Sequence, residues 1–412
     1  MKRARIIFYA FFFAAAAFAA ALLAAPSWVN HPFPRPHIKK LLHEYLRRNV
    51  KDPHITFADY RTDLLSYVQF DSVEVSSKNL AKHLIDRVVV RYGLEDLPRR
   101  KFSGTVNYGS IRVVFDAVVA SPRDITVLIS TDWMDAEELY YKILRKAWKK
   151  LFKDVSMSGK VRITAECRFK NGVPSAKGLI TVKDGALKFN EYNLNFVRLN
   201  GYMPFYHNMT GTQDGGKEFG KVTAEKAAYM KLKFTNVKGD VSCRDLKLTF
   251  PKLSATFMKS QAEGTGRLWV EDGKIGFYME GIFKKIDLNG FNELINNPEY
   301  RINGYGNGRL IVGGVGSKLK ECFIRLASTE QQGTVNAGVI RKLLGYIPQN
   351  DIREKVEIVI KDKPAFVFTK GFFSFEKKPG KYEANLLLDG DHLLDFKINI
   401  DEELINDIID GQ

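Results

Sequence analysis

The chain has 412 residues, of which 45% are hydrophobic, and a formal net charge of +16. This length allows two domains or one elongated domain, and the hydrophobic content argues against global disorder. The excess of basic residues is typical of proteins that meet an acidic partner, such as an anionic membrane or a nucleic acid.

The first residues favour a membrane over a nucleic acid. Met1–Arg5 is basic, and the uncharged, apolar stretch Ile6–Ala25 follows it. A helix of about twenty residues spans about 30 Å, which is the thickness of a bilayer core. We therefore expect an N-terminal transmembrane helix, with residues 26–412 exported. A signal peptide that is cleaved near Ala24 and Ala25 is the alternative.

The region up to residue 100 reads as a linker with mixed helices and strands. Residues 26–40 carry four prolines and predict an extended linker. His37–Asn49 places Ile38, Leu41 and Leu42 on one helical stripe, which predicts a helix. Ser72–Leu94 predicts a short strand that leads into a second helix, with Ser76 or Ser77 as its cap.

From Lys101 the apolar residues recur every second position. Phe102–Ser130 predicts three strands, separated by turns at Tyr108–Gly109 and Ser121–Asp124. A helix is expected next at Asp135–Lys153, because its acidic residues come first and its basic residues last. Packing on the end of the sheet is the favoured interpretation of this helix, and a position on a membrane surface is the alternative.

One twelve-residue pattern occurs twice, at Gly178–Phe189 and Gly266–Phe277, and a degenerate copy begins at Gly308. Each full copy holds Asp-Gly between alternating apolar runs, which predicts a tight hairpin. In the second copy the hairpin would pair Val270 with Ile275, Leu268 with Phe277, and Glu271 with Lys274. In the first copy, a turn at Asp184 and Gly185 would pair Val182 with Leu187. In the third copy, Gly313 and Gly314 stand where the Asp-Gly turn would be.

The remainder of the chain, Val155 to Ile400, predicts a long series of strands. A polar loop at His207–Gly220 and short helices near Phe291–Asn297 and Ala337–Tyr346 interrupt it. We therefore expect a mainly β protein: a long, twisted antiparallel sheet folded into an apolar trough, with a few short helices. The expected organisation is an anchor at 1–25, a mixed region at 26–100 and an elongated β-sheet domain at 101–412.

Sequence motifs for catalysis or metal binding are missing. The seven histidines are scattered, the glycine cluster at 304–316 lacks a P-loop ending, and His207 with Asp214 has no nucleophile in register. The three cysteines, Cys167, Cys243 and Cys322, have no zinc spacing and are expected as buried thiols, although a Cys167–Cys243 bridge is a second possibility. We expect no enzyme, no cofactor and no metal.

The motifs together resemble the AsmA-like superfamily of bacterial envelope proteins, which includes TamB and YdbH and is related to bridge-like lipid transfer proteins. The resemblance rests on the anchor, on "MSGKVRI" followed by "GLITVKDGALKF", and on "GYGNGRLIVGG" followed by "QQGTVNAGVIRKLLGYIP". It covers about residues 130–350. It implies a protein anchored in the inner membrane, with its bulk in the periplasm, that carries phospholipid toward the outer membrane.

The residues themselves are compatible with this resemblance, because the few expected helices cannot cover so long a sheet. An acyl chain of a phospholipid or another lipid could provide the missing cover. The expected lining of the groove is Ile180, Val182, Leu187, Phe189, Leu194, Phe196, Leu268, Val270, Ile275, Phe277, Leu310 and Val312. A sheet that closes on itself, with these residues as ordinary core, is the structural alternative. An anchored chaperone or scaffold for outer-membrane proteins is the functional alternative.

The C-terminal end, Asp401–Gln412, is acidic and amphipathic. A protein partner is one candidate target for this segment, and a cap on the open edge of the sheet is the other.

Overall fold

The computed structural model of the protein describes most of the chain from residue 54 onward. The described residues are 36–37, 39–41, 44, 54–63, 66–77, 80–93, 95–121, 124–145, 155–170, 173–190, 193–208, 218–229, 232–271, 274–290, 292, 297–316, 318–329, 331–345, 351–361 and 363–403.

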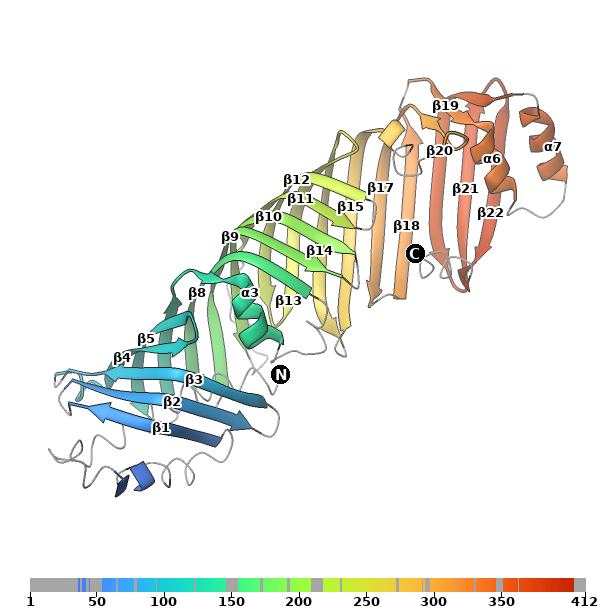
Figure 1. The fold of residues 1–412 in the computed structure, drawn as a ribbon. Coiled ribbons are helices and arrows are strands. Elements are labelled where there is room, and N and C mark those ends of the chain that lie inside the picture. The colour runs from blue at the N-terminus through green and yellow to red at the C-terminus, as the bar shows by residue number, and fades with distance from the viewer. Residues whose placement is uncertain are drawn as a thin grey trace. The chain divides into compact units, whose positions relative to one another are not determined.

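The fold is mainly β, as expected, with a long antiparallel sheet and few short helices (Figure 1). Most of the described pairings join strands that are neighbours in the chain, and most of the others skip a single strand, so the sheet is largely a meander. The strands are β1 (His54–Thr62), β2 (Tyr67–Ser77), β3 (Leu80–Arg91), β4 (Lys101–Tyr108), β5 (Ile111–Ser121), β6 (Asp124–Thr131), β7 (Met134–Asp135), β8 (Val155–Lys170), β9 (Val173–Phe189), β10 (Leu194–Asn208), β11 (Gly220–Tyr229), β12 (Leu232–Arg244), β13 (Lys247–Phe257), β14 (Ser260–Glu271), β15 (Lys274–Asp287), β16 (Ile302–Asn303), β17 (Tyr305–Val315), β18 (Lys318–Ser328), β19 (Gly333–Asn336), β20 (Ala365–Lys378), β21 (Lys381–Gly390) and β22 (Leu393–Asp401).

The chain forms two compact units, which we describe separately. The N-terminal unit contains residues 1–187, 200–220 and 243–245. The C-terminal unit contains residues 188–199, 221–242 and 246–412.

In the N-terminal unit, β1 to β6 and β8 pair antiparallel in chain order, apart from the short β7, which also pairs with β8. One face of these strands forms a buried core that includes Phe57, Val90, Phe115 and Cys167. The alternation of apolar and polar residues decides which face this is, since successive side chains point to opposite sides of a strand. Because β3 pairs with β4, the sheet continues across residue 100.

The helix expected within Ser72–Leu94 is wrong, because this stretch forms the end of β2 and all of β3. Val88 and Val90 are buried and pair with Phe70 and Val68 of β2. A run of β-branched residues favours a strand, where the branched side chain packs well on the pleated surface. Pairing with β2 therefore outweighs the weaker helical spacing of the preceding residues.

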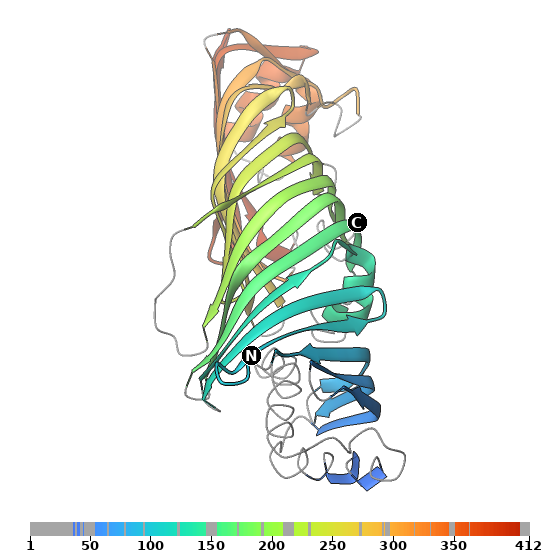
Figure 2. The same cartoon turned by 90° about the vertical axis from the view of Figure 1, so that its left-hand side faces the viewer.

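The three strands expected within Phe102–Ser130 are confirmed as β4, β5 and β6. The expected helix after them begins at Ala136, as α3 (Ala136–Leu139), and continues as η1 (Tyr140–Leu144). Ala136 and Leu139 pack with Ile111, Met134 and Val161 of the sheet, and α3 contacts β8 (Figures 1 and 2). This part of the helix therefore packs on the sheet, whereas residues 146–154 lie outside the described residues.

In the C-terminal unit, β13, β14, β15, β17, β18, β20, β21 and β22 pair antiparallel in that order. Two helices lie on one face of the last three of these strands, namely α6 (Ala337–Leu344) and α7 (Asp351–Ile360) (Figure 1). Helix α6 confirms the helix expected near Ala337–Tyr346, whereas α7 was not expected. Ile340 and Leu344 are buried there against residues such as Phe396 and Ile398.

The three copies of the twelve-residue pattern form different local structures. The second copy is confirmed as the β14–β15 hairpin, with Leu268 opposite Phe277, Val270 opposite Ile275 and Glu271 opposite Lys274. The described contacts of the Glu271 carboxylate are with Trp269 Nε1 and Lys320 Nζ. The turn residues 272 and 273 lie outside the described residues.

The hairpin expected in the first copy is wrong, because β9 runs through Asp184 and Gly185 as one strand. Asp184 has φ of 49°, and its N–H donates to Asn200 Oδ1 at 2.8 Å. Positive φ suits a bulge as well as a turn. The expected pairing of Val182 with Leu187 therefore does not form, since both lie on the same strand.

In the third copy the turn also lies elsewhere than expected. Gly313 and Gly314 belong to β17, and the turn follows Gly316, which has φ of 62°. The strands on its two sides are in register, with Val315 opposite Lys318. The extra residues lengthen the hairpin and leave Leu310 and Val312 in the middle of a strand.

No helix among the residues placed by the structure is long and apolar enough to cross a membrane. The expected transmembrane stretch, Ile6–Ala25, lies outside these residues. So do most of His37–Asn49 and of the C-terminal end; the placed residues of the former, such as Lys39 and Glu44, are helical. All three cysteines are free thiols in strands; Cys167 and Cys322 are buried, and Cys243 is half-buried.

The covering role of α6 can be tested with a matched pair of isoleucines. Ile340 of α6 is 0% exposed, whereas Ile358 of α7 is 73% exposed. We expect Ile340→Ala to lower the free energy of unfolding by about 2–5 kcal/mol, because it leaves a cavity in the core. Ile358→Ala should change it by less than about 0.5 kcal/mol. Urea titrations followed by circular dichroism measure both, and equal losses would contradict the assignment.

Candidate functional site

The backbone register of the C-terminal unit brings six of the twelve expected lining residues onto one face, which we call the inner face. Directly opposed residues of antiparallel strands point to the same side of a sheet. Leu268 and Val270 of β14 lie opposite Phe277 and Ile275 of β15. Further along β15, Met279 lies opposite Val312, and Gly281 lies opposite Leu310 of β17. Their role as a lipid site remains a prediction.

The same register extends the inner face to the neighbouring strands. Leu310 and Val312 lie opposite Ile324 and Cys322 of β18, and Ile324 lies opposite Phe375 of β20. Inner-face residues that the sequence analysis did not include are Leu248, Phe250, Met279, Phe283, Ile324, Leu326, Phe373 and Phe375. Continuing the alternation beyond the twelve-residue pattern would have found most of them.

Two bulges keep apolar residues on this face at points where the alternation in the sequence is interrupted. The pairing shifts by one residue between Phe250 and Leu253 of β13, and again between Phe283 and Ile286 of β15. Lys285, in the second bulge, has φ of 51°. An extra residue in one strand restores the apolar residues after it to the original face. Lys284 and Lys285 are exposed, while Phe283 and Ile286 are buried.

The expected lining residues are only partly buried. None of the twelve belongs to the fully buried core, and Val270 is 41% exposed. Met279, between Phe277 and Gly281 on the same face, is 43% exposed. By contrast, inner-face residues under α6 and α7 are buried in one cluster, and Phe283 and Ile286 are buried in another, against which Leu310 packs. Between these clusters the inner face stays accessible within the described part of the unit.

Glycines on the inner face leave space between the larger side chains. The three along β14 and β15 are Gly264, Gly266 and Gly281. A Cβ on Gly264 would meet the carbonyl oxygen of Glu280 at 2.2 Å, so close backbone approach requires glycine there. A Cβ on Gly281 would have its nearest neighbour at 3.7 Å, in the ring of Phe283. Packing therefore does not require glycine at 281, and the position is open.

The outer face of the same strands is more polar, although it also carries Ile282, which is 51% exposed. Arg309 Nη2 binds Glu280 Oε1 at 2.6 Å, and Lys397 Nζ binds Glu383 Oε2 at 2.6 Å. The guanidinium of Arg325 lies 4.9 Å from the ring centroid of Phe372. These pairs join neighbouring strands, which stabilises a sheet modestly. The ion pairs of the outer face favour contact with water, so the inner face, which lacks such pairs over the described strands β14, β15 and β17, is the one that needs a cover.

The other six expected lining residues are spread over the two units. Ile180 and Val182 pack in the N-terminal unit against the cluster under α3, which contains Met134 and Val161. Leu187 of the same unit is half-buried. In the C-terminal unit, the remaining three are also half-buried: Phe189, Leu194 and Phe196.

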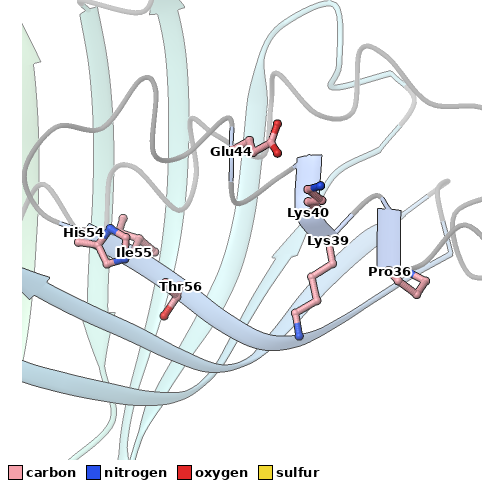
Figure 3. Close-up of a pocket in the computed structure, with 7 residues that line it drawn as sticks. All are labelled: Pro36, Lys39, Lys40, Glu44, His54, Ile55 and Thr56. Carbon is pink, nitrogen blue, oxygen red and sulfur yellow. The ribbon is translucent and has the colours of Figure 1, made fainter.

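A separate cavity of about 440 Å³ lies in the N-terminal unit between the helical residues 36, 37, 39–41 and 44 and strand β1 (Figure 3). Its lining is Pro36, Lys39, Lys40, Glu44, His54, Ile55 and Thr56. Lys39 Nζ donates to the carbonyl oxygen of Ala58 at 2.5 Å. With only two apolar lining residues, this cavity does not suit an acyl chain.

No group of metal-binding side chains occurs within the described ranges. His207 Nδ1 lies 3.1 Å from Asp245 Oδ1, while Asp214 lies outside those ranges. Burial raises the pKa of the Cys167 thiol to about 12, so this thiol stays protonated at neutral pH. These observations do not test whether the protein is an enzyme, so the absence of a catalytic site remains a prediction.

Comparisons with protein-family models, with curated proteins and with solved structures gave no match. The resemblance to the AsmA-like superfamily therefore rests on the sequence motifs alone.

A charged cluster around Glu166 in the N-terminal unit predicts a pH dependence of stability. Glu166 of β8 binds Lys177 Nζ at 2.9 Å and also binds Arg168 Nε. The hydrogen bond from Lys177 is the largest cause that lowers the pKa of Glu166; partial burial opposes it, and Arg168 adds to it. Because the pKa is lower in the folded state, the ionised carboxylate of Glu166 stabilises the fold at pH values above its unfolded-state pKa. This stabilisation is lost as the pH falls through the folded-state pKa.

We therefore expect Glu166→Gln to cost about 1 kcal/mol of unfolding free energy at neutral pH and almost nothing in acid. Denaturant titrations at a series of pH values measure this. Glu321→Gln, on an exposed residue of β18, is the control and should have little effect at any pH. A loss for Glu166→Gln that is the same at all pH values would refute the electrostatic explanation.

Proposed function

We propose that this protein binds the acyl chain of a lipid on the inner face of its sheet. The observation that carries the proposal is the pairing of an apolar, partly exposed inner face with a charged outer face in the C-terminal unit. A soluble protein rarely leaves a contiguous apolar surface of this kind without a partner. The accessible part of the inner face runs along strands, so a long unbranched chain fits its chemistry.

The energetics of an acyl chain are sufficient for this kind of binding. Each buried CH₂ group contributes about 0.8 kcal/mol. Ten such groups contribute about 8 kcal/mol before the costs of association are subtracted, and those costs are of similar size. The chain alone therefore gives modest affinity, which suits a protein that must release its lipid as well as bind it.

We further propose that the protein is anchored in a bacterial inner membrane by Ile6–Ala25, lies mainly in the periplasm, and takes part in phospholipid transport between the inner and outer membranes. This part rests on the basic start Met1–Arg5, on the apolar stretch after it and on the AsmA-like motifs. The inner face of the C-terminal unit would then be part of an apolar trough along which the acyl chain lies.

The test compares two neighbouring residues of β17 that face opposite ways. Val312 is on the inner face, whereas Ile311 lies opposite Glu280 on the outer face. We expect the purified chain to carry phospholipid in mass spectrometry after extraction. Val312→Asp should remove at least about nine-tenths of that lipid, because an acyl chain that covered the carboxylate would strip it of water at a high cost. Ile311→Asp should keep the lipid.

A third variant tells an open face from a closed core. Val335 of β19 is buried in the cluster under α6, so Val335→Asp should unfold the unit by burying an unpaired charge. Val312→Asp should keep its circular-dichroism spectrum and its cooperative unfolding. Unfolding by Val312→Asp as severe as that by Val335→Asp would contradict the open face. Lipid that persists in folded Val312→Asp would contradict the proposed site.

A further inference from the structure

The inner face of the C-terminal unit carries one charged residue among the described positions that the register of β13 to β22 assigns to it. This residue is Lys377, near the end of β20, opposite Tyr382 of β21. Lys377 is half-buried, and its side chain is 14% exposed. Every other such position holds an apolar or aromatic residue, cysteine, glycine or serine. A half-buried cation on an otherwise uncharged face needs a specific reason, because removing a charge from water is costly.

The surroundings of Lys377 hold its ammonium group in place. Nζ donates to the carbonyl oxygen of Leu319 at 2.7 Å and to the carboxylate of Glu402. It also lies 5.4 Å from the ring centroid of Tyr382. The Tyr382 side chain is fully buried and stacks on Phe375, with ring centroids 5.2 Å apart. The ammonium is therefore positioned by β18, β21 and the residue that follows β22.

The register places this ammonium close to the accessible part of the inner face. Val312 of β17 lies opposite Cys322 of β18. Phe323 of β18 lies opposite Glu376 of β20, so the next residues along these antiparallel strands, Cys322 and Lys377, are neighbours across the sheet. Adjacent strands lie about 4.8 Å apart, so Lys377 is about 10 Å across the sheet from Val312. That span is within reach of a lipid whose chain lies over β14 to β18.

The ammonium stays charged at neutral pH. Burial alone would lower the pKa of Lys377, but the hydrogen bond and charge of Glu402, together with Tyr382, outweigh it, and the pKa is raised. The partner that achieves this is a carboxylate from the residue directly after β22, and its side chain is 31% exposed. Such a carboxylate can turn toward water if another anion takes its place.

We propose that Lys377 binds the anionic head group, phosphate or carboxylate, of an amphiphile whose chain lies on the inner face, and that Glu402 occupies this position in its absence. The inference rests on the proposed function. Its chemistry is that of an anionic amphiphile, with a long apolar chain and one negative group at the end. A neutral amphiphile of equal chain length would gain only the apolar contacts and would leave Glu402 in place.

A purely structural ion pair is a weaker explanation of the same geometry. A buried or half-buried ion pair is often no more stabilising than apolar residues of similar size. Apolar residues at positions 377 and 402 would continue the inner face without a desolvation cost. The pair instead leaves the cation with a partner that is partly exposed and lies outside the strands.

The experiment uses the full chain and two probes that share one chain, oleate and oleyl alcohol. Titration calorimetry below the micelle concentration gives both dissociation constants. We expect the wild type to bind oleate at least about tenfold more tightly, as one charge-assisted hydrogen bond allows. Lys377→Met should bind the two probes equally, and Lys377→Arg should restore the preference. Glu402→Gln should strengthen binding of oleate and leave oleyl alcohol unchanged.

The outcomes separate this inference from the proposed function. If wild type and Lys377→Met both bind oleate and oleyl alcohol equally, the head-group site is refuted and the acyl-chain site stands. If neither probe binds the folded wild type, the proposed function fails. If inorganic phosphate alone raises the melting temperature of the wild type as much as oleate does, and Lys377→Met abolishes that shift, the site takes free phosphate and the head-group inference is refuted. Glu402→Gln, which keeps Lys377, supplies the test should Lys377→Met fail to fold.

Discussion

The apolar inner face of the sheet must be shielded from water. The arrangement of the C-terminal unit depends on what shields each part of that face. Helices α6 and α7 cover it over β20 to β22, where Phe396 and Ile398 are buried. A second buried cluster, around Phe283 and Ile286, covers it near the other end of β15. Between the two, Val270 and Met279 stay more than one-third exposed. A bound acyl chain would complete the cover there.

Face selection depends on register, since a slip of one residue would reverse every side chain of a strand. The bulges near Leu253 and Ile286 therefore help to keep apolar side chains on the inner face. They turn Lys284 and Lys285 outward while Phe283 and Ile286 remain inside. The outer ion pairs, such as Arg309 with Glu280, reinforce the same register from the other side.

The sequence was sufficient for features that depend on neighbouring residues. It predicted the β14–β15 hairpin and its register, the strands β4 to β6, and the helix α6. It was not sufficient where distant strands decide. The Asp-Gly pair at 184 and 185 lies within a continuous strand, and there the side chain of Asn200 accepts from the Asp184 N–H. Likewise, Val88 and Val90 form a strand because β2 and β4 flank them.

The candidate site was predictable only in part, because local alternation is visible in the sequence whereas the pairing of strands is not. Alternation alone placed Leu268, Val270, Ile275 and Phe277 on one face. The additional inner-face residues of β18 and β20 needed the pairing of β17 with β18 and of β18 with β20, which no local pattern encodes. Lys377 was missed because a lysine near a strand end usually reads as solvent-exposed. Only its position opposite the buried Tyr382 shows that it faces inward.

The most direct test of the central claim is to map where an acyl chain lies on the folded protein. A fatty acid with a photoreactive diazirine in the middle of its chain can be cross-linked to the purified chain and the labelled peptides sequenced. The account predicts labels on inner-face residues such as Met279, Leu310 and Val312, and none on outer-face neighbours such as Tyr278 and Ile311. Labels divided equally between the two faces, or confined to the outer face, would contradict it.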